Sequence, residues 1–121
     1  MTEIKIVKEV TDEFLSDILV TAFDGSYGAC NYWADSILAE EDDDGWVELR
    51  ASDLEDGEQW IITRETVSIG IERILDGSRP INSDLVDYIS RGVDENDAGD
   101  IDANCADCIL QFGVFGELVY A

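Results

Sequence analysis

The chain of 121 residues contains no histidine, one proline and only seven basic side chains. The lack of histidine removes the commonest general base at neutral pH and the commonest metal ligand of proteins. The scarcity of proline and lysine excludes Pro-rich linkers and basic tails. No run of about 18 apolar residues occurs, so we expect no membrane span. The first ten residues also lack the basic and apolar regions of a secretory signal, and we expect a cytoplasmic protein.

Cysteine is scarce as well, with three residues at positions 30, 105 and 108. An odd number argues against a disulfide framework, so we expect Cys30, Cys105 and Cys108 to be small buried hydrophobic residues. Cys105 and Cys108 have the C-x-x-C spacing of zinc and redox sites. A structural zinc site needs four ligands, and the fourth is missing here unless a carboxylate supplies it. A metal site or a redox pair therefore remains only as an alternative.

Acidic residues are abundant: 29 Asp and Glu face 7 Lys and Arg, which gives a net charge of −22. Such a surface repels nucleic acid and anionic membranes and attracts basic proteins. Two interpretations compete. The charge can serve solubility alone, or it can form an interface in which carboxylates take the place of DNA phosphates against lysine and arginine.

With 45% hydrophobic residues the chain can bury a core, and its length predicts one domain over residues 1–121. We predict an α+β fold with a mixed or antiparallel sheet of about five strands, packed by about three helices. The strands are expected at residues 3–10, 31–38, 46–51, 59–63 and 117–120. Helices are expected after Thr11, after Thr63, and after Asp102 or Asn104, with a shorter one from Asn82 or Ser83 to about Gly92.

The densest acidic region lies between residues 40 and 58. Residues 40–44 read as a solvated loop of like charge, and residues 52–58 read as the turn of a hairpin. We expect the partner contacts to come from this region: Glu40, Glu41, Asp42, Asp43, Asp44, Asp53, Glu55, Asp56 and Glu58.

An aromatic pair offers a second kind of site. Tyr32 and Trp33 are most simply core residues. The alternative is a small-molecule or signal-nucleotide pocket in which they act together with an arginine, Arg50 or Arg64. An arginine that points into an aromatic pocket would distinguish this alternative.

The segment from Asp94 to Asp102 resembles the first half of a calcium-binding loop. Ala98 stands where a ligand belongs at position five, and Cys105 replaces the bidentate glutamate at position twelve. We therefore expect a solvated acidic loop, no metal and no cofactor. No phosphate-binding glycine loop and no nucleophile–histidine arrangement is present, so we expect a protein that is not an enzyme.

Two sets of residues carry a family resemblance. They are Thr21-Ala-Phe-Asp-Gly25 with Asn31-Tyr-Trp33, and Gly99-Asp-Ile-Asp102 with Ala106-Asp107, Gln111 and Phe115-Gly-Glu-Leu-Val-Tyr120. With them the chain resembles a group of small uncharacterised proteins of bacteriophages and other mobile elements. Ser26 departs from that pattern, in which a second glycine often follows the first. The group implies no catalytic or binding residues.

The resemblance implies a phage accessory protein in the cytoplasm of a host cell. By analogy with other small acidic phage proteins, we expect an inhibitor or decoy of the anti-defence type, such as a DNA mimic or an anti-CRISPR protein. Its partner would be a basic host protein, for instance a nuclease, rather than nucleic acid or a membrane. The alternatives are the small-molecule binder, a virion-associated protein that is acidic only for solubility, and self-association into a homo-oligomer.

Overall fold

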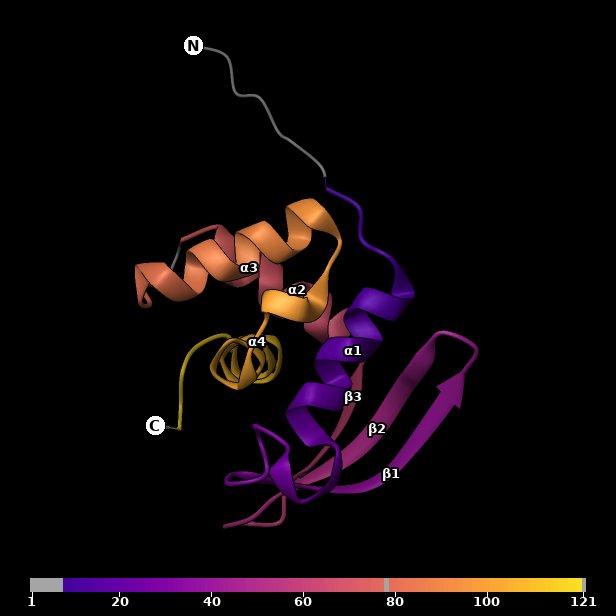
Figure 1. Ribbon diagram of the computed structural model, residues 1–121. Coiled ribbons are helices and arrows are strands. Elements are labelled where there is room, and N and C mark those ends of the chain that lie inside the picture. The colour runs from indigo at the N-terminus through magenta and orange to yellow at the C-terminus, as the bar shows by residue number, and fades with distance from the viewer. Residues whose placement is uncertain (1–7, 78, 121) are drawn as a thin grey trace.

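The computed structural model describes residues 8–77 and 79–120. Within them the chain runs in the order α1 (Asp12–Phe23), η1 (Gly25–Tyr27), β1 (Ala34–Asp42), β2 (Gly45–Asp53), β3 (Gln59–Thr63), α2 (Arg64–Leu75), α3 (Ser83–Glu95), η2 (Ala98–Asp100) and α4 (Ala103–Phe115). The α-helices gather on one side, and the β1–β2 hairpin projects on the other (Figure 1). The predicted α+β class is therefore confirmed.

The sheet is antiparallel, with the strand order β1-β2-β3. Its inner face contributes Leu49, Ala51 and Ile62 to the core, all at most 1% exposed. The apolar stripe of α1 and the long buried run of α4 complete that core. On the second face of the sheet Arg50 and Ile61 are exposed, and Glu48 and Ser52 are partly buried.

The predicted helix starts are confirmed, since each is encoded by a local capping residue. The Thr11 side chain accepts a hydrogen bond from the Phe14 backbone N–H, which begins α1. Thr63 and Thr66 cap each other at the start of α2. The side chains of Asn82 and Asp102 each accept a hydrogen bond from a backbone N–H and so cap the starts of α3 and α4.

Two glycines let α2 and α4 cross with their backbones close together. A Cβ on Gly70 would lie 2.0 Å from the carbonyl oxygen of Ile109, and a Cβ on Gly113 would lie 2.3 Å from that of Thr66. Gly70 therefore marks a contact between two helices.

The prediction of about five strands is wrong, since the described residues form three. Residues 3–7 of the first predicted strand lie outside the described part, and residues 8–10 have no regular structure. Residues 117–120 are not a strand either, because the backbone of Val119 and Tyr120 bonds to the side chain of Gln111 instead of a strand. Of the four α-helices in the described residues, α3 corresponds to the shorter helix expected from Asn82 or Ser83.

Two predicted acidic loops are partly regular structure. Glu40, Glu41 and Asp42 belong to β1, and only Asp43 and Asp44 form the turn, which pairs Asp42 with Gly45. Two-residue hairpin turns are common, but the run of like charges led to the prediction of a longer loop. Likewise α3 continues to Glu95, where Asn96 ends it with a left-handed backbone (φ 49°).

No helix in the described ranges combines the length and the apolar character that crossing a bilayer requires.

Candidate functional site

The predicted acidic face divides into two clusters at opposite ends of β2. Glu40, Glu41, Asp43 and Asp44 are exposed around the β1–β2 turn, and Glu55, Asp56 and Glu58 are exposed around the β2–β3 turn. We call these the first and the second acidic turn. β2 has nine residues, which spans about 27 Å in an antiparallel strand. A partner that contacts both turns must therefore be a macromolecule.

Asp42 is exposed, but its carboxylate is already paired with an arginine of the same chain. Arg64 donates to both of its oxygens, with Nη1–Oδ2 at 2.9 Å and Nη2–Oδ1 at 2.6 Å. The same guanidinium donates through Nε to the Ser16 hydroxyl (2.8 Å) and the Trp46 carbonyl (3.1 Å). Hydrogen bonding from Arg64 lowers the pKa of Asp42. Arg64 thus joins the hairpin to α2, and its bond to Ser16 joins both to α1.

Asp53 is also used internally, at the opposite end of β2. Asp53 is only 7% exposed. It accepts hydrogen bonds from the Tyr120 hydroxyl (2.5 Å) and from the backbone N–H groups of Glu55 (2.7 Å) and Asp56 (3.1 Å). These bonds lower the pKa of Asp53, and the first of them raises the pKa of Tyr120 to about 12. Of the nine predicted contacts, Asp42 and Asp53 are therefore structural residues.

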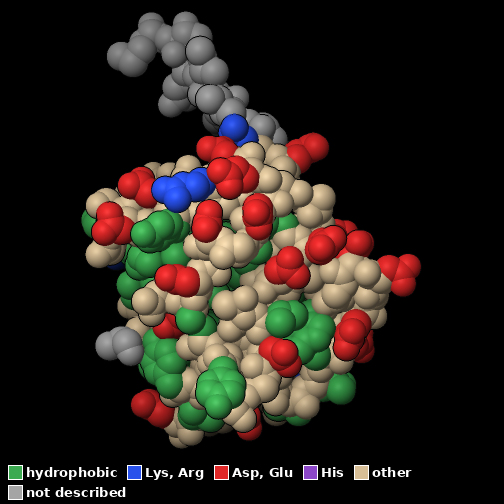
Figure 2. Space-filling model, viewed as in Figure 1, with side chains coloured by type: hydrophobic (Ala, Val, Ile, Leu, Met, Phe, Trp, Pro, Cys, Tyr) green, Lys and Arg blue, Asp and Glu red, His purple; other side chains and the backbone are tan. Residues whose placement is uncertain are grey.

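Most described basic side chains have internal partners. Lys8 lies 3.2 Å from Asp94, and Arg79 lies 3.4 Å from Glu117. Arg73 donates to the Phe112 carbonyl at 2.6 Å. The visible face of the molecule accordingly carries scattered carboxylates, with its few basic side chains gathered near one end (Figure 2). Little positive charge remains to offset the two acidic turns.

A carboxylate on α4 organises a second polar cluster that the sequence analysis did not identify. Asp107 accepts hydrogen bonds from the Tyr32 hydroxyl (2.6 Å), Trp33 Nε1 (2.9 Å) and Gln111 Nε2 (2.9 Å). The Cys30 thiol lies 3.8 Å from the same carboxylate. Burial, followed by the bond to Asp107, raises the pKa of Tyr32.

Gln111, one turn further along α4, extends this cluster to the C-terminal segment. Its Oε1 accepts the backbone N–H groups of Val119 and Tyr120, both at 2.8 Å, and its Nε2 donates to the Tyr120 carbonyl at 3.2 Å. The Tyr120 ring stacks on Trp33 with centroids 5.5 Å apart and planes at 5°. The cluster therefore joins Tyr32 and Trp33 to α4 and to the C-terminal segment.

The alternative ligand pocket is not assembled. Trp33 is 1% exposed and lies beside the end of β2 that carries Asp53. Arg64 is bound near the other end of that strand, to Asp42 and to the Trp46 carbonyl. Arg50 is exposed on the outer face of the sheet, whereas Trp33 is buried.

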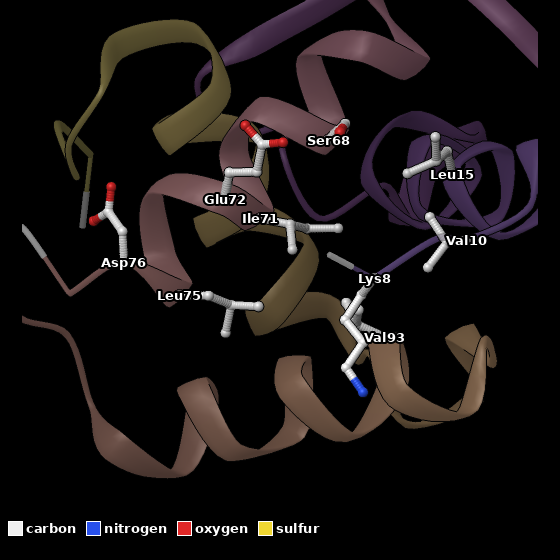
Figure 3. Close-up of a pocket in the computed structure, with 9 residues that line it drawn as sticks. All are labelled: Lys8, Val10, Leu15, Ser68, Ile71, Glu72, Leu75, Asp76 and Val93. Carbon is white, nitrogen blue, oxygen red and sulfur yellow. The ribbon is translucent and has the colours of Figure 1, made fainter. Parts of the chain in front are cut away.

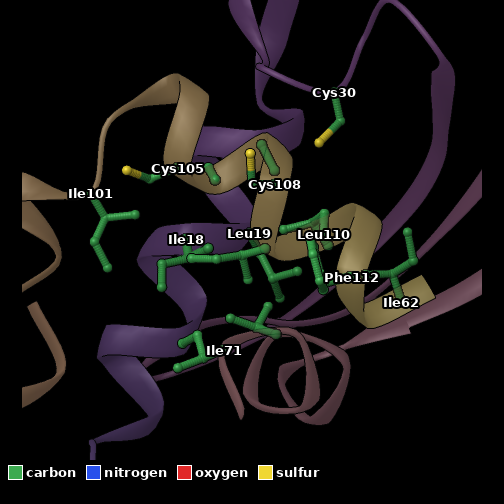
Figure 4. Close-up of a cluster of buried hydrophobic side chains, with 14 of the residues drawn as sticks. Ile18, Leu19, Cys30, Ile62, Ile71, Ile101, Cys105, Cys108, Leu110 and Phe112 are labelled. Atoms are coloured by element: carbon green, nitrogen blue, oxygen red, sulfur yellow. The ribbon is translucent and has the colours of Figure 1, made fainter. Parts of the chain in front are cut away.

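All three cysteines are buried and free, as predicted. Figure 4 shows Cys105 and Cys108 on α4, and Cys30 on a separate segment, among apolar side chains. Burial raises the pKa of Cys30, that of Cys105 to about 12 and that of Cys108 to about 11. Across residues 8–77 and 79–120, no group of three Cys, Asp or Glu side chains is arranged to hold a metal ion.

A groove of about 430 Å³ lies between α2, the end of α3 and the segment that leads into α1 (Figure 3). Its lining is mainly aliphatic: Lys8, Val10, Leu15, Ser68, Ile71, Glu72, Leu75, Asp76 and Val93. Lys8 already pairs with Asp94. The groove therefore suits apolar contact better than acid–base chemistry.

Comparison of the chain with protein-family models, with curated proteins and with solved structures finds no match.

Proposed function

We propose that this chain is a non-enzymatic binding protein whose two acidic turns engage a basic, nucleic-acid-binding protein. The observation that carries the proposal is the distribution of free carboxylates. Asp42 is exposed but bonded to Arg64, and Asp53 is buried and bonded to Tyr120. The other seven predicted contacts are exposed at the two ends of β2, and of these Asp56 accepts the backbone N–H of Glu58. Exposed carboxylates on a rigid hairpin can take the positions of phosphates against arginine and lysine.

The spacing of the two turns supports a macromolecular partner. Clusters of one sign at both ends of a nine-residue strand present a charged surface about 27 Å long, a scale comparable to several nucleotides of DNA. A net charge of −22 also speeds encounter with a basic protein at low salt.

The remaining parts of the proposal rest on the chemistry of the chain. It has no histidine, and its three thiols are buried with raised pKa values, which suits binding better than catalysis. With the family resemblance, we infer an accessory protein of a phage or mobile element that acts as an anti-defence inhibitor in the host cytoplasm.

A competition experiment tests the proposal. The tagged protein is incubated with host extract, and bound proteins are eluted by a salt step or, separately, by duplex DNA. We expect recovery of a nucleic-acid-binding protein that both treatments release, because DNA and the acidic turns compete for the same cations. Recovery of no such protein, or of one that DNA does not displace, contradicts the proposal.

Variants of the acidic residues test which surface binds the partner. Glu41→Gln with Asp43→Asn and Asp44→Asn removes three charges of the first acidic turn and leaves Asp42 with Arg64. We expect weaker binding and a smaller salt dependence, since fewer ion pairs form on binding. The matched control is Asp84→Asn with Asp87→Asn and Glu95→Gln, three carboxylates of α3. Equal losses for both variants would show that net charge, and not this turn, governs binding.

A further inference from the structure

The two edges of the sheet differ in how well they are protected. β1 has two register shifts, and its exposed side chains include four carboxylates: Asp35, Glu40, Glu41 and Asp42. Bulges and charges of this kind hinder the pairing of another strand with an edge. β3 has the sequence Gln-Trp-Ile-Ile-Thr, without charge, proline, glycine or register shift. The β3 edge therefore lacks the protection that β1 has.

The hydrogen-bond register shows which residues of β3 face β2. The backbone N–H of Asp53 donates to the Glu58 carbonyl at 2.7 Å, so Glu58 faces β2. In an antiparallel pair, residues that bond to the neighbouring strand alternate with residues that do not. Trp60 and Ile62 therefore also bond to β2.

The intervening residues Gln59, Ile61 and Thr63 direct their N–H and C=O groups away from β2. As this orientation requires, the Thr63 N–H donates elsewhere, to the Thr66 hydroxyl at 3.1 Å. Within residues 8–77 and 79–120, β3 pairs with β2 alone. The backbone groups of Gln59 and Ile61 are thus available to a further strand.

A groove of about 480 Å³ lies beside β3. Residues of β3, of the start of α2 and of the end of α4 line it: Gln59, Trp60, Ile61, Thr66, Gly113 and Val114. A strand added to β3 would direct its side chains alternately into this groove and onto the outer face next to Ile61, which is 60% exposed. Both faces of such a strand therefore have room for apolar side chains.

The charges around β3 indicate what the added strand carries. Glu58 directly precedes β3 and Glu65 follows it, and both are exposed. Glu58 also belongs to the second acidic turn, so the edge continues the acidic surface described above. At the centre of the strand, Arg50 of β2 pairs with Ile61 and disfavours a further cation there. The edge thus complements a segment with basic ends and an apolar centre.

We propose that the β3 edge binds an extended segment of the basic partner, antiparallel to β3, as a fourth strand of the sheet. Main-chain hydrogen bonds give the affinity in this mode, and alternate side chains give the specificity. The inference rests on the function proposed above, because the segment belongs to the protein that the acidic turns engage. A second copy of the chain is a poorer occupant, since it brings together two net charges of −22.

Amide hydrogen exchange, followed by NMR on the isotope-labelled protein, tests the edge. The probe is the peptide Lys-Val-Ile-Val-Lys with blocked termini. In the free protein the N–H of Ile61 should exchange about tenfold faster than that of Ile62 or more, because only Ile62 bonds to β2. The peptide should slow exchange at Ile61 by about tenfold and leave Ile62 unchanged. Equal protection of both in the free protein, or no protection of Ile61 at about 1 mM peptide, overturns the proposal.

Methylation of the peptide backbone separates strand addition from attraction between charges. The N–H of the central isoleucine would donate to the Ile61 carbonyl, whereas the N–H groups of the valines point away from β3. N-methylation at the isoleucine should therefore weaken binding about tenfold. N-methylation at one valine, with the same charge, is the matched control and should change binding little. Equal effects of the two methylated peptides overturn the proposal.

A protein variant extends the test to the natural partner. Ile61→Pro removes an N–H at the free edge, where proline is tolerated, and Ile61→Val is the control that keeps it. We expect Ile61→Pro alone to bind the captured partner about tenfold more weakly. If the variant of the first acidic turn loses binding and a folded Ile61→Pro does not, the proposed function stands and strand addition is wrong. Capture of no partner contradicts the proposed function, and the peptide results then decide on the edge.

Discussion

The two ends of β2 both carry carboxylates and use them in different ways. At the end near Asp53, the carboxylates of Asp53 and Asp107 accept hydrogen bonds from uncharged groups: a tyrosine hydroxyl, an indole N–H and an amide. At the other end, Asp42 is bound by the guanidinium of Arg64, and Asp43 and Asp44 beside it stay exposed. Carboxylates that are surrounded by hydrogen-bond donors thus stabilise the fold. Carboxylates without such donors stay free for a partner.

Removal of the Asp107 carboxylate is expected to have the largest effect on stability. In Asp107→Ala the indole N–H of Trp33, a residue that is 1% exposed, loses its acceptor, and the Gln111 amide loses one of its acceptors. We expect a loss of about 3 kcal/mol in the free energy of unfolding, measured by urea denaturation. Asp107→Asn keeps one acceptor oxygen and should lose less. A loss no larger than that of Asp43→Ala would contradict a structural role for the cluster.

A smaller and pH-dependent effect is expected for Tyr120→Phe. The folded pKa of Asp53 is lowered, so its stabilisation is present above the unfolded value of about 3.9 and is lost as the pH falls below it. The pKa of Tyr120 is raised to about 12, so its stabilisation is complete below about pH 10 and is lost as the pH approaches the folded value.

Tyr120→Phe should therefore make the stability of the protein less dependent on pH in both the acidic and the alkaline range. The measurement is thermal unfolding across pH in wild type and variant. Tyr27→Phe is the matched control, because Tyr27 is 97% exposed. If both variants show the wild-type profile, the Tyr120–Asp53 bond does not contribute to stability.

The smallest effect on stability is expected at the first acidic turn. Asp43→Asn with Asp44→Asn should change the free energy of unfolding by no more than about 0.5 kcal/mol, with a slight gain at low salt from reduced self-repulsion. Chemical denaturation at two salt concentrations measures it. A substantial loss would mean that these carboxylates hold the hairpin and are not free for a partner.

Local features of the fold were predictable, and features that depend on distant residues were not. Thr11, Thr63 and Asp102 cap their helices through contacts three residues away, so the sequence alone indicates them. The alternation in β2 and β3 likewise revealed the second hairpin. The Asp107 cluster joins residues 74 and 75 positions apart, and no local pattern specifies such a pairing.

The C-terminal segment shows why the strand count was wrong. Residues 117–120 have the composition of a strand, and their backbone needs hydrogen-bond partners. Gln111 supplies those partners through its side-chain amide, which a periodicity argument does not consider. In the acidic region, the sequence does not show that the carboxylates of Asp42 and Asp53 are paired within the chain, since this depends on Arg64 and Tyr120.

The stacking of Tyr120 on Trp33 gives the molecule an internal optical signal. Trp33 also contacts Phe115, at 5.5 Å, and Trp60, at 5.7 Å, between ring centroids. Fixed aromatic packing of this kind produces near-ultraviolet circular dichroism, and loss of the packing removes that signal while far-ultraviolet ellipticity can persist. Undocking of the C-terminal segment can therefore be followed spectroscopically on the unlabelled protein, separately from the melting of its helices.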